Sequence, residues 1–302
     1  MIKIVTLGTA AGGGLPQWNC GCDNCTAART SEPQLRATQA SLAISADDSN
    51  WFLINASPDL RQQIIDNPVL HPRPGQLRHS PIAGVILTNG EVDAVAGLLS
   101  MREGWPFGLY AHERVHEILN ANSIFNVLAP DKVKRIAIAP GTPFEPSLPD
   151  GTPSGLEILP FAAPGKTALF LEGVAENDDG DTLGLRITDT SDGRSFVFLA
   201  ACAGITPELT PYLDGASLIF FDGTLWHDDE LIALGLGSKT GQRMGHIAMD
   251  AAIPALAGLG IDRKFFLHIN NSNPALQPAS NERQQAEAAG WQIPADGMEI
   301  TL

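Results

Sequence analysis

Three cysteines, Cys20, Cys22 and Cys25, lie within one stretch of six residues. Three thiolates supply all but one of the ligands of a tetrahedral zinc ion, and Gly21 allows the backbone to turn tightly between them. The polar residues around the cysteines argue against three buried, reduced thiols in an apolar core. Cys22 and Cys25 also have the Cys-x-x-Cys spacing of a redox pair, which is the alternative. The spacing predicts a structural zinc site.

A second polar cluster follows a predicted strand, in the stretch from residue 86 to residue 98. This stretch has the form strand, short turn and helix, and it resembles the Thr-His-x-His-x-Asp-His-x-x-Gly-Leu motif of metallo-β-lactamase-fold enzymes. In that motif the histidines and the aspartate hold one or two metals at the edge of a sheet. Here Asp93 keeps its position, whereas Asn89, Glu91 and Ala94 stand at the histidine positions. A dinuclear zinc hydrolase site of the usual kind is therefore not expected, although Glu91 could still bind a hard metal.

Longer motifs extend through nearly the whole chain. They comprise Gly8 to Cys20, Asn55 to Asp59, Leu99 to Gly104, Phe221 to Trp226, Arg243 to His246 and His268 to Pro274. Together they resemble the family of B proteins of pyrroloquinoline quinone (PQQ) biosynthesis. That family is similar to phosphodiesterases related to ribonuclease Z, in which a three-cysteine cluster near the N-terminus binds structural zinc. Those enzymes complete the zinc site with a histidine three residues beyond the position of His268, where this chain has Asn271. The fourth zinc ligand is thus open between His268, Asn271 and water.

The resemblance to the PQQ family also implies an active-site metal. The residues that would converge on this metal, and that would be catalytic, are Asp93, Asp222, His246 and His268. Two histidines and one carboxylate with open positions suit iron(II) as well as a second zinc. The family is thought to oxidise a tyrosine-derived precursor of PQQ, so the resemblance implies a metal-dependent oxygenase or hydroxylase. Ala94 departs from the Asp-His pair of most members, because alanine has no donor atom.

Two other functions are alternatives to an oxygenase. The first is a non-catalytic carrier that binds PQQ or its precursor and takes part in transport towards the periplasm. The second is a phosphodiesterase, which the missing histidines and the acidic charge make the least favoured of the three.

Several of these residues also have a purely structural interpretation. His268 ends an apolar strand before a polar loop, the usual place of functional groups in such sheets, and this place favours a ligand over a buried histidine that bonds to backbone. His246, at a predicted helix start, is either a ligand or a cap. Lys166 stands where the superfamily often has a metal-binding histidine, and it could pair with a substrate carboxylate. A solvated surface lysine is the favoured interpretation of Lys166, and Cys202 is expected in the core.

The chain has 34 acidic and 19 basic residues and a formal net charge of −15. This charge repels phosphate backbones and no local basic patch offsets it, so we expect no nucleic-acid partner. No apolar run reaches the ~18 residues that cross a bilayer, and the first residues read as a strand and a glycine turn rather than a signal peptide. We therefore expect a cytoplasmic protein without a membrane partner, and a homodimer is compatible with the sequence.

Short continuous apolar runs predict central strands at residues 2–7, 41–45, 51–55, 82–88, 194–199, 217–221 and 263–268. Helices are predicted after Ser57, as the N-cap before Pro58, and at residues 91–103, 112–121, 207–214, 246–258 and 281–289. Pairs of strands followed by alternating strands and helices recur in both halves. The sequence thus predicts an α/β fold, a metallo-β-lactamase-like αβ/βα four-layer sandwich. We expect a single domain over residues 1–302, made of two pseudo-repeated halves that join near residues 140–153.

Overall fold

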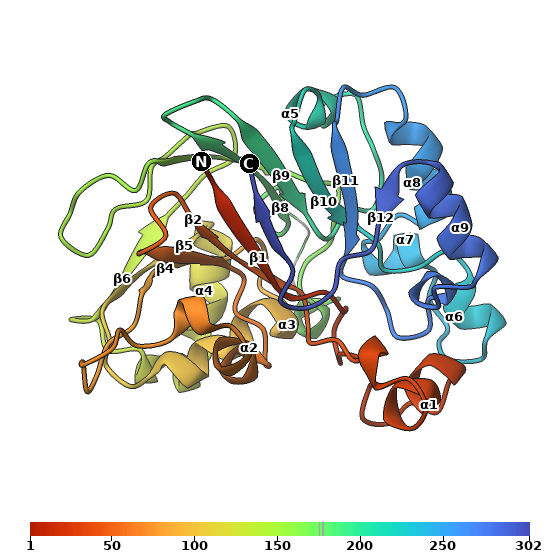
Figure 1. Cartoon of the computed structure of the whole chain (residues 1–302), viewed down its shortest axis with the longest axis horizontal. Coiled ribbons are helices and arrows are strands. Elements are labelled where there is room, and N and C mark those ends of the chain that lie inside the picture. The colour runs from red at the N-terminus through yellow and green to blue at the C-terminus, as the bar shows by residue number, and fades with distance from the viewer. Residues whose placement is uncertain (175, 177) are drawn as a thin grey trace.

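A computed structural model describes residues 1–174, 176 and 178–302, which form two β-sheets packed against each other (Figure 1). The first sheet has the order β13-β1-β2-β3-β4-β5-β6, and the second has the order β12-β11-β10-β9-β8-β7. The strands of the first sheet are β1 (Lys3–Gly8), β2 (Ser41–Ser45), β3 (Trp51–Ile54), β4 (Ile82–Ile86), β5 (Phe107–Ala111), β6 (Val133–Ala137) and β13 (Glu299–Thr301). Those of the second are β7 (Leu156–Ala162), β8 (Leu183–Asp189), β9 (Ser195–Leu199), β10 (Leu218–Asp222), β11 (Arg263–Leu267) and β12 (Trp291–Gln292).

Each sheet is antiparallel at one end and parallel at the other. Strands β13, β1, β2 and β3 pair antiparallel, and β3 to β6 pair parallel. In the second sheet β7, β8 and β9 pair antiparallel, and β9 to β12 pair parallel. Because parallel strands end at the same edge of a sheet, the residues that follow β4, β10 and β11 are brought to edges where a site can form.

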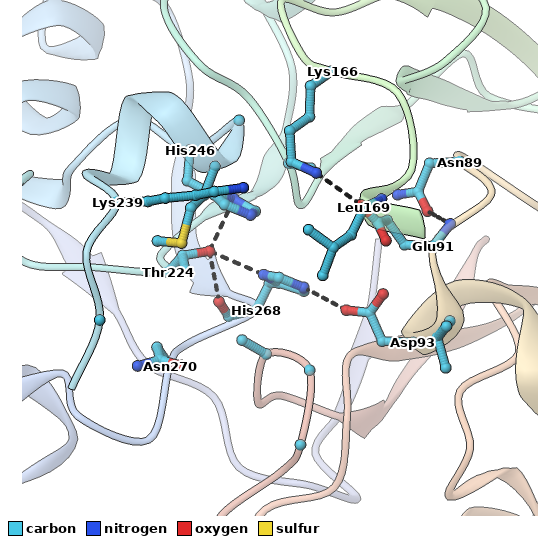
Figure 2. A pocket seen from close by; sticks show the side chains of 18 of the residues that line it. Asn89, Glu91, Asp93, Lys166, Leu169, Thr224, Lys239, His246, His268 and Asn270 are labelled. Carbon is cyan, nitrogen blue, oxygen red and sulfur yellow. Dashed lines mark hydrogen bonds and ion pairs between the residues drawn. The ribbon is translucent and has the colours of Figure 1, made fainter. Parts of the chain in front are cut away.

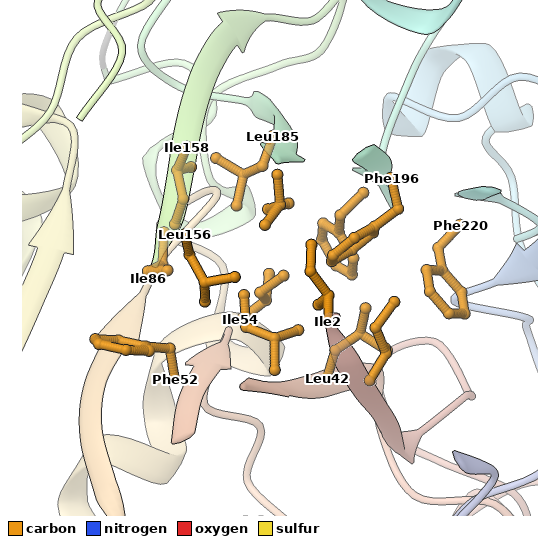
Figure 3. Close-up of a cluster of buried hydrophobic side chains, with 14 of the residues drawn as sticks. Ile2, Leu42, Phe52, Ile54, Ile86, Leu156, Ile158, Leu185, Phe196 and Phe220 are labelled. Atoms are coloured by element: carbon orange, nitrogen blue, oxygen red, sulfur yellow. The ribbon is translucent and has the colours of Figure 1, made fainter. Parts of the chain in front are cut away.

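Both faces of each sheet are buried, which explains the continuous apolar runs of the central strands. Neighbouring residues point to opposite faces, so Ile4 packs between the two sheets whereas Val5 packs on the outer face of the first. Phe220 and Phe221 divide in the same way between the inner and outer faces of the second sheet. Figure 3 shows the inner cluster, to which β1 to β4 contribute from one side and β7 to β10 from the other.

Helices cover the two outer faces. The first sheet is covered by α2 (Leu60–Asp66), α3 (Val92–Val95) and α4 (Glu113–Ala121), and the second by α5 (Thr210–Leu213), α8 (Met249–Leu256) and α9 (Asn281–Ala288). Three further helices lie near the loops, namely α1 (Asp23–Arg29), α6 (Glu230–Ala233) and α7 (Gly241–Met244). The layers therefore run helix, sheet, sheet, helix, and the predicted four-layer α/β sandwich of the metallo-β-lactamase type is confirmed. The link from β6 to β7, which contains residues 140–153, passes from the first sheet to the second.

Two helix predictions are wrong in their details. The helix expected after Ser57 begins at Leu60 with Asp59 as its N-cap residue, because the Ser57 hydroxyl bonds to Gln63 Oε1 instead of to the helix start. The helix expected over residues 91–103 is α-helical only in α3 and continues as a 3-10 helix over Ala96–Met101.

The other helices are shorter than predicted. The helix expected at 246–258 begins at Met249, so His246 lies in the loop before it and is not a residue of its first turn. Within the described residues, none of the helices combines the length and the apolar character that a membrane crossing requires.

Candidate functional site

The loops that follow β4, β10 and β11 line a cavity of about 960 Å³. Asp93 comes from the loop and helix after β4, Thr224 from the residues after β10, and His268 directly follows β11. His246, from the loop between α7 and α8, completes this side of the cavity. Figure 2 shows His268 between Thr224 and Asp93, with His246 beside it.

His268 and Asp93 form an ion pair, in which His268 Nε2 lies 2.9 Å from Asp93 Oδ2. Burial alone would lower the pKa of His268, but the hydrogen bond and the charge of Asp93 outweigh it, so this pKa is raised above its usual value. Burial would likewise raise the pKa of Asp93, and the contact with His268 lowers it instead. His268 has a φ of 59°, a left-handed conformation that is uncommon for residues other than glycine. The backbone is therefore held in an unusual geometry at the point where the imidazole meets the carboxylate.

Asp222 is fully buried and accepts hydrogen bonds on both carboxylate oxygens. Its Oδ1 accepts from the Thr224 N–H at 3.0 Å and from the Thr224 hydroxyl at 2.7 Å. Its Oδ2 accepts from the Cys202 N–H at 2.9 Å and lies 2.8 Å from His246 Nδ1. A carboxylate has about four lone-pair positions, so these four contacts occupy its hydrogen-bonding capacity. Asp222 is thus fixed in place, and it fixes His246 in turn.

The four residues predicted to converge on an active-site metal lie together. Donor atoms of Asp222, His246 and His268 all lie within 4.8 Å of one another, and Asp93 contacts His268. The two imidazole rings stack with centroids 5.1 Å apart and planes 19° from parallel. The arrangement offers two imidazoles and the Asp93 carboxylate at one wall of the cavity, with Asp222 fully buried beside His246, and the role of the four residues as ligands stays a prediction.

The residues at the other histidine positions of the motif have different partners. Glu91 Oε1 lies 3.0 Å from Lys166 Nζ and accepts from the Leu169 N–H at 2.9 Å. Asn89 Oδ1 accepts from the Glu91 N–H at 2.9 Å. Ala94 is buried, and its carbonyl accepts a hydrogen bond from Ala56. Glu91 thus anchors the loop that contains Lys166.

Lys166 is not the solvated surface lysine that was favoured from the sequence. Its side chain is only 18% exposed and lines the cavity, because the carboxylates of Glu91 and Glu172 hold it there, each 3.0 Å from its Nζ. Glu172 also bonds to Lys239 at 2.6 Å. The contacts with Lys239 and Lys166 hold the pKa of Glu172 at about 2. One wall of the cavity therefore consists of alternating acidic and basic groups.

The three cysteines gather at a second site, with their sulfur atoms within 4.8 Å of one another. The Asn271 side-chain amide faces all three, with Nδ2 at 3.1 Å from Cys20 Sγ, 3.5 Å from Cys22 Sγ and 3.3 Å from Cys25 Sγ. Burial raises the pKa of the Cys25 thiol to about 11. Of the two residues considered for the fourth ligand position, Asn271 lies against the sulfurs, whereas His268 is engaged by Asp93 and Thr224. Cys202 is buried in the core cluster of the second sheet, as predicted.

Two functional contributions were not found from the sequence. Thr224 touches Asp222 and both imidazoles, and its only signal was its place two residues after Asp222 within a family motif. Glu230 is buried and accepts from the Trp226 N–H at 2.8 Å and from the Ser272 hydroxyl at 2.6 Å. Burial raises the pKa of Glu230. This residue ties the loop after His268 to α6.

A family model described as a β-lactamase superfamily domain matches residues 50–269. The chain is 64% identical to coenzyme PQQ synthesis protein B of Bradyrhizobium diazoefficiens and 51% identical to that of Gluconacetobacter diazotrophicus, with the whole of each chain covered in both comparisons. Both alignments are full-length, so the similarity is not confined to one motif.

Solved structures give the same relationship. The crystal structure of Zn²⁺-bound PqqB from Methylobacterium extorquens is 45% identical, with a TM-score of 0.93 over 99% of this chain and 100% of that one. A diphosphatase from the PhnP family is 20% identical, with a TM-score of 0.69 over 99% of this chain and 96% of that one. At this lower identity the likeness concerns the fold alone.

Proposed function

Because this chain belongs to the coenzyme PQQ synthesis protein B family of the β-lactamase superfamily, and so takes part in PQQ biosynthesis, we propose that it is a metal-dependent oxygenase or hydroxylase acting on a tyrosine-derived PQQ precursor. The observation that carries the proposal is the contact between Asp93 and His268 beside His246. It provides two imidazoles and a carboxylate at one wall of a cavity large enough for a small organic substrate.

The donor set fits an ion of the iron(II) or zinc type. Asp93 and His268 are poised to share a cation, since an oxygen of one and a nitrogen of the other face each other at 2.9 Å. His246 lines the same cavity, and Asp222 holds it by its Nδ1 atom. An iron(II) ion bound there would supply the redox chemistry that activation of dioxygen requires.

The remaining walls suit an aromatic amino-acid derivative. Leu169 and Phe170 offer apolar surface to a ring, and the ammonium groups of Lys166 and Lys239 offer partners to carboxylates. Both lysines already pair with Glu91 or Glu172, so a substrate carboxylate would share their ammonium groups with these two glutamates. We assign them to binding and orienting the substrate against the imidazoles.

We further propose that Cys20, Cys22 and Cys25 hold a structural zinc ion, closed by the side chain of Asn271. The nitrogen and oxygen of an amide exchange places by a half-turn, so Asn271 can direct its oxygen at an ion among the sulfurs. The Zn²⁺-bound relative from Methylobacterium extorquens supports a zinc site in this family.

A second candidate function is a carrier that binds PQQ or its precursor without converting it, on the way to the periplasm. The observation that favours it is Ala94, a buried methyl group at a position where the metal enzymes of this fold have a histidine. A site that lacks this metal-binding histidine could still bind PQQ or its precursor without converting it.

Reconstitution separates the two functions. Metal-free protein is loaded with iron(II) under anaerobic conditions, mixed with a cross-linked Glu-Tyr substrate, exposed to oxygen, and the products are analysed by mass spectrometry. An oxygenated product from wild type, and none from His268→Gln, is the expected result. His227→Gln is the matched control, because His227 is 59% exposed and pairs with Asp250 outside the cavity. Tight PQQ binding by wild type without any oxygenated product would instead establish the carrier.

A further inference from the structure

We propose that Thr224 is a positioning residue that orients both imidazoles of the site and thereby sets its affinity for metal. This inference rests on the proposed metal site, but the orientation itself is a property of the metal-free protein. Thr224 is buried and its hydroxyl lies at the centre of the cluster. Figure 2 shows its contacts with His246 and His268.

The Thr224 Oγ1 atom has four polar neighbours. It lies 2.7 Å from Asp222 Oδ1, 3.0 Å from His246 Nδ1, 2.9 Å from His268 Nδ1 and 3.0 Å from the His268 carbonyl oxygen. A hydroxyl has one hydrogen to donate and two lone pairs that accept. Asp222 Oδ1 and the His268 carbonyl oxygen can only accept, and Asp222 Oδ1 is the nearer of the two, so the Thr224 hydrogen is directed to it.

This assignment fixes the protonation of both rings at Nδ1. With its hydrogen on Asp222, the Thr224 oxygen accepts the Nδ1–H of His268, and the Nδ1–H of His246 is shared with Asp222 Oδ2 at 2.8 Å. In each ring Nε2 is then the nitrogen left to face a metal. In the metal-free protein His268 Nε2 donates its own proton to Asp93, and a metal would take the place of that proton. Thr224 therefore holds the ring orientation that presents Nε2 to a metal.

The backbone holds Thr224 in the position that this role requires. Its N–H donates to Asp222 Oδ1, and its carbonyl accepts from the Asn270 N–H at 3.0 Å. Gly223, which precedes it, lies so close to β11 that an added Cβ would be 2.8 Å from the Cβ of Phe266. The strand end is thus packed tightly beside His268, and the hydroxyl has little freedom to leave the cluster.

Thr224→Val removes the hydroxyl and keeps the shape of the side chain, whereas Thr224→Ser keeps the hydroxyl. Partners that orient ligating imidazoles typically change metal affinity by about 10–100-fold when they are removed, and we expect a loss of this size for Thr224→Val. Thr224→Ser should restore most of it. Thr6→Val is the matched control, because the buried Thr6 hydroxyl donates to the Ala295 carbonyl at 2.7 Å, away from the cavity.

Two measurements test the inference. Cobalt(II) is titrated into metal-free protein against a chromophoric chelator, and the affinity of the site that remains in a Cys22→Ser background is compared between the variants. Long-range ¹H–¹⁵N spectra of histidine-labelled, metal-free protein then identify the protonated ring nitrogens. Wild type is expected to show a hydrogen-bonded Nδ1–H that exchanges slowly in both His246 and His268, and Thr224→Val to lose this signal in His268, whose Nδ1 then has no hydroxyl partner.

The outcomes distinguish this inference from the proposed function. Unchanged ring-nitrogen signals in Thr224→Val overturn the positioning role, whatever the cobalt affinity of the variant. Changed signals with wild-type cobalt affinity overturn its link to metal binding. A wild type in which the cysteines take the only metal contradicts the proposed function, and the spectra still decide whether Thr224 orients the two rings.

Discussion

The imidazole of His268 meets the carboxylate of Asp93 at 2.9 Å, although 175 residues separate them in the chain. Each of the two groups lowers the free energy of charging the other in this partly buried environment. Without metal, His268 and Asp93 therefore form an ion pair. A metal ion would take the place of the proton between them. The same two groups therefore report on protonation in the metal-free protein and on coordination in the loaded one.

The stability of metal-free protein should depend on pH through this pair. The lowered pKa of Asp93 stabilises the fold above the unfolded value of about 3.9, and this contribution is lost as the pH falls through the folded pKa. The raised pKa of His268 stabilises the fold below about 6.5, and this contribution is lost as the pH rises through the folded pKa. The pair should contribute most between about pH 4 and 6.5. Urea unfolding of wild type and Asp93→Asn across pH 3–9 measures this contribution. If the two proteins differed in unfolding free energy by the same amount at every pH, the ion pair would be contradicted.

Cys22→Ser should lower the metal content from two ions per chain to one, because only two thiolates remain at the cysteine site. Elemental analysis after reconstitution with excess metal and removal of the unbound ions gives the count. Cys202→Ala is the control, since Cys202 is also a free thiol but lies in the apolar core of the second sheet. A Cys22→Ser protein that keeps both ions would rule out the cysteine cluster as a metal site.

Ala94→His should strengthen metal binding and weaken the metal-free fold. The alanine borders a small cavity of about 20 Å³ next to Asp93 and His268, which is too small for an imidazole. Overpacking of this kind costs about 1–3 kcal/mol, while the added nitrogen offers a further ligand. Urea unfolding with and without zinc should therefore show a lower midpoint without metal and a larger upward shift with it. An equal shift in variant and wild type would mean that position 94 does not face the ion.

Gly97→Ala should destabilise the protein by about 1–3 kcal/mol, because a Cβ at this position would meet the Ser57 carbonyl oxygen at 2.1 Å. Gly97 also donates its N–H to the Ala56 carbonyl at 2.8 Å, so the two backbone segments cannot easily separate. Gly258→Ala is the matched control, since nothing lies within 4 Å of its added Cβ, and it should be neutral or stabilising by up to about 1 kcal/mol. Equal effects at the two glycines would refute the close packing.

Strands β1 to β4 and β9 to β11 were predictable because both faces of their sheets are buried, whereas β5, β7, β8 and β12 were not predicted. The runs that contain Phe220 and Ile86 read as continuous apolar segments, and the structure places strands there. Strand β6 was missed because two of its five residues are basic and several are partly exposed. Strand β13 was missed because it has only three residues and depends on pairing with β1. An edge strand such as β6 or β13 depends on pairing with a neighbouring strand, and the local sequence pattern does not reveal that pairing.

The residues of the site could be predicted where a sequence motif contains them. They could not be predicted where only the folded geometry brings them to the site. Asp93 and His268 were proposed through the family motifs that contain them, and His268 also through its place at the end of a strand. Thr224 and Glu230 act by hydrogen bonds to residues far away in the chain, and nothing in their own neighbourhood indicates which atoms they meet. The same holds for Lys166, whose two carboxylate partners decide that it faces the cavity.

The distribution of the two sites along the chain has a consequence for its assembly. Cys25 and Asn271 are 246 residues apart, and Asp93 and His268 are 175 apart, so each site needs both sheets to be in place. A nascent chain folds progressively and could offer only fragments of either ligand set. An ion at either proposed site would thus be retained only by molecules whose folding is complete. Metal content would therefore report how far a population of chains has matured.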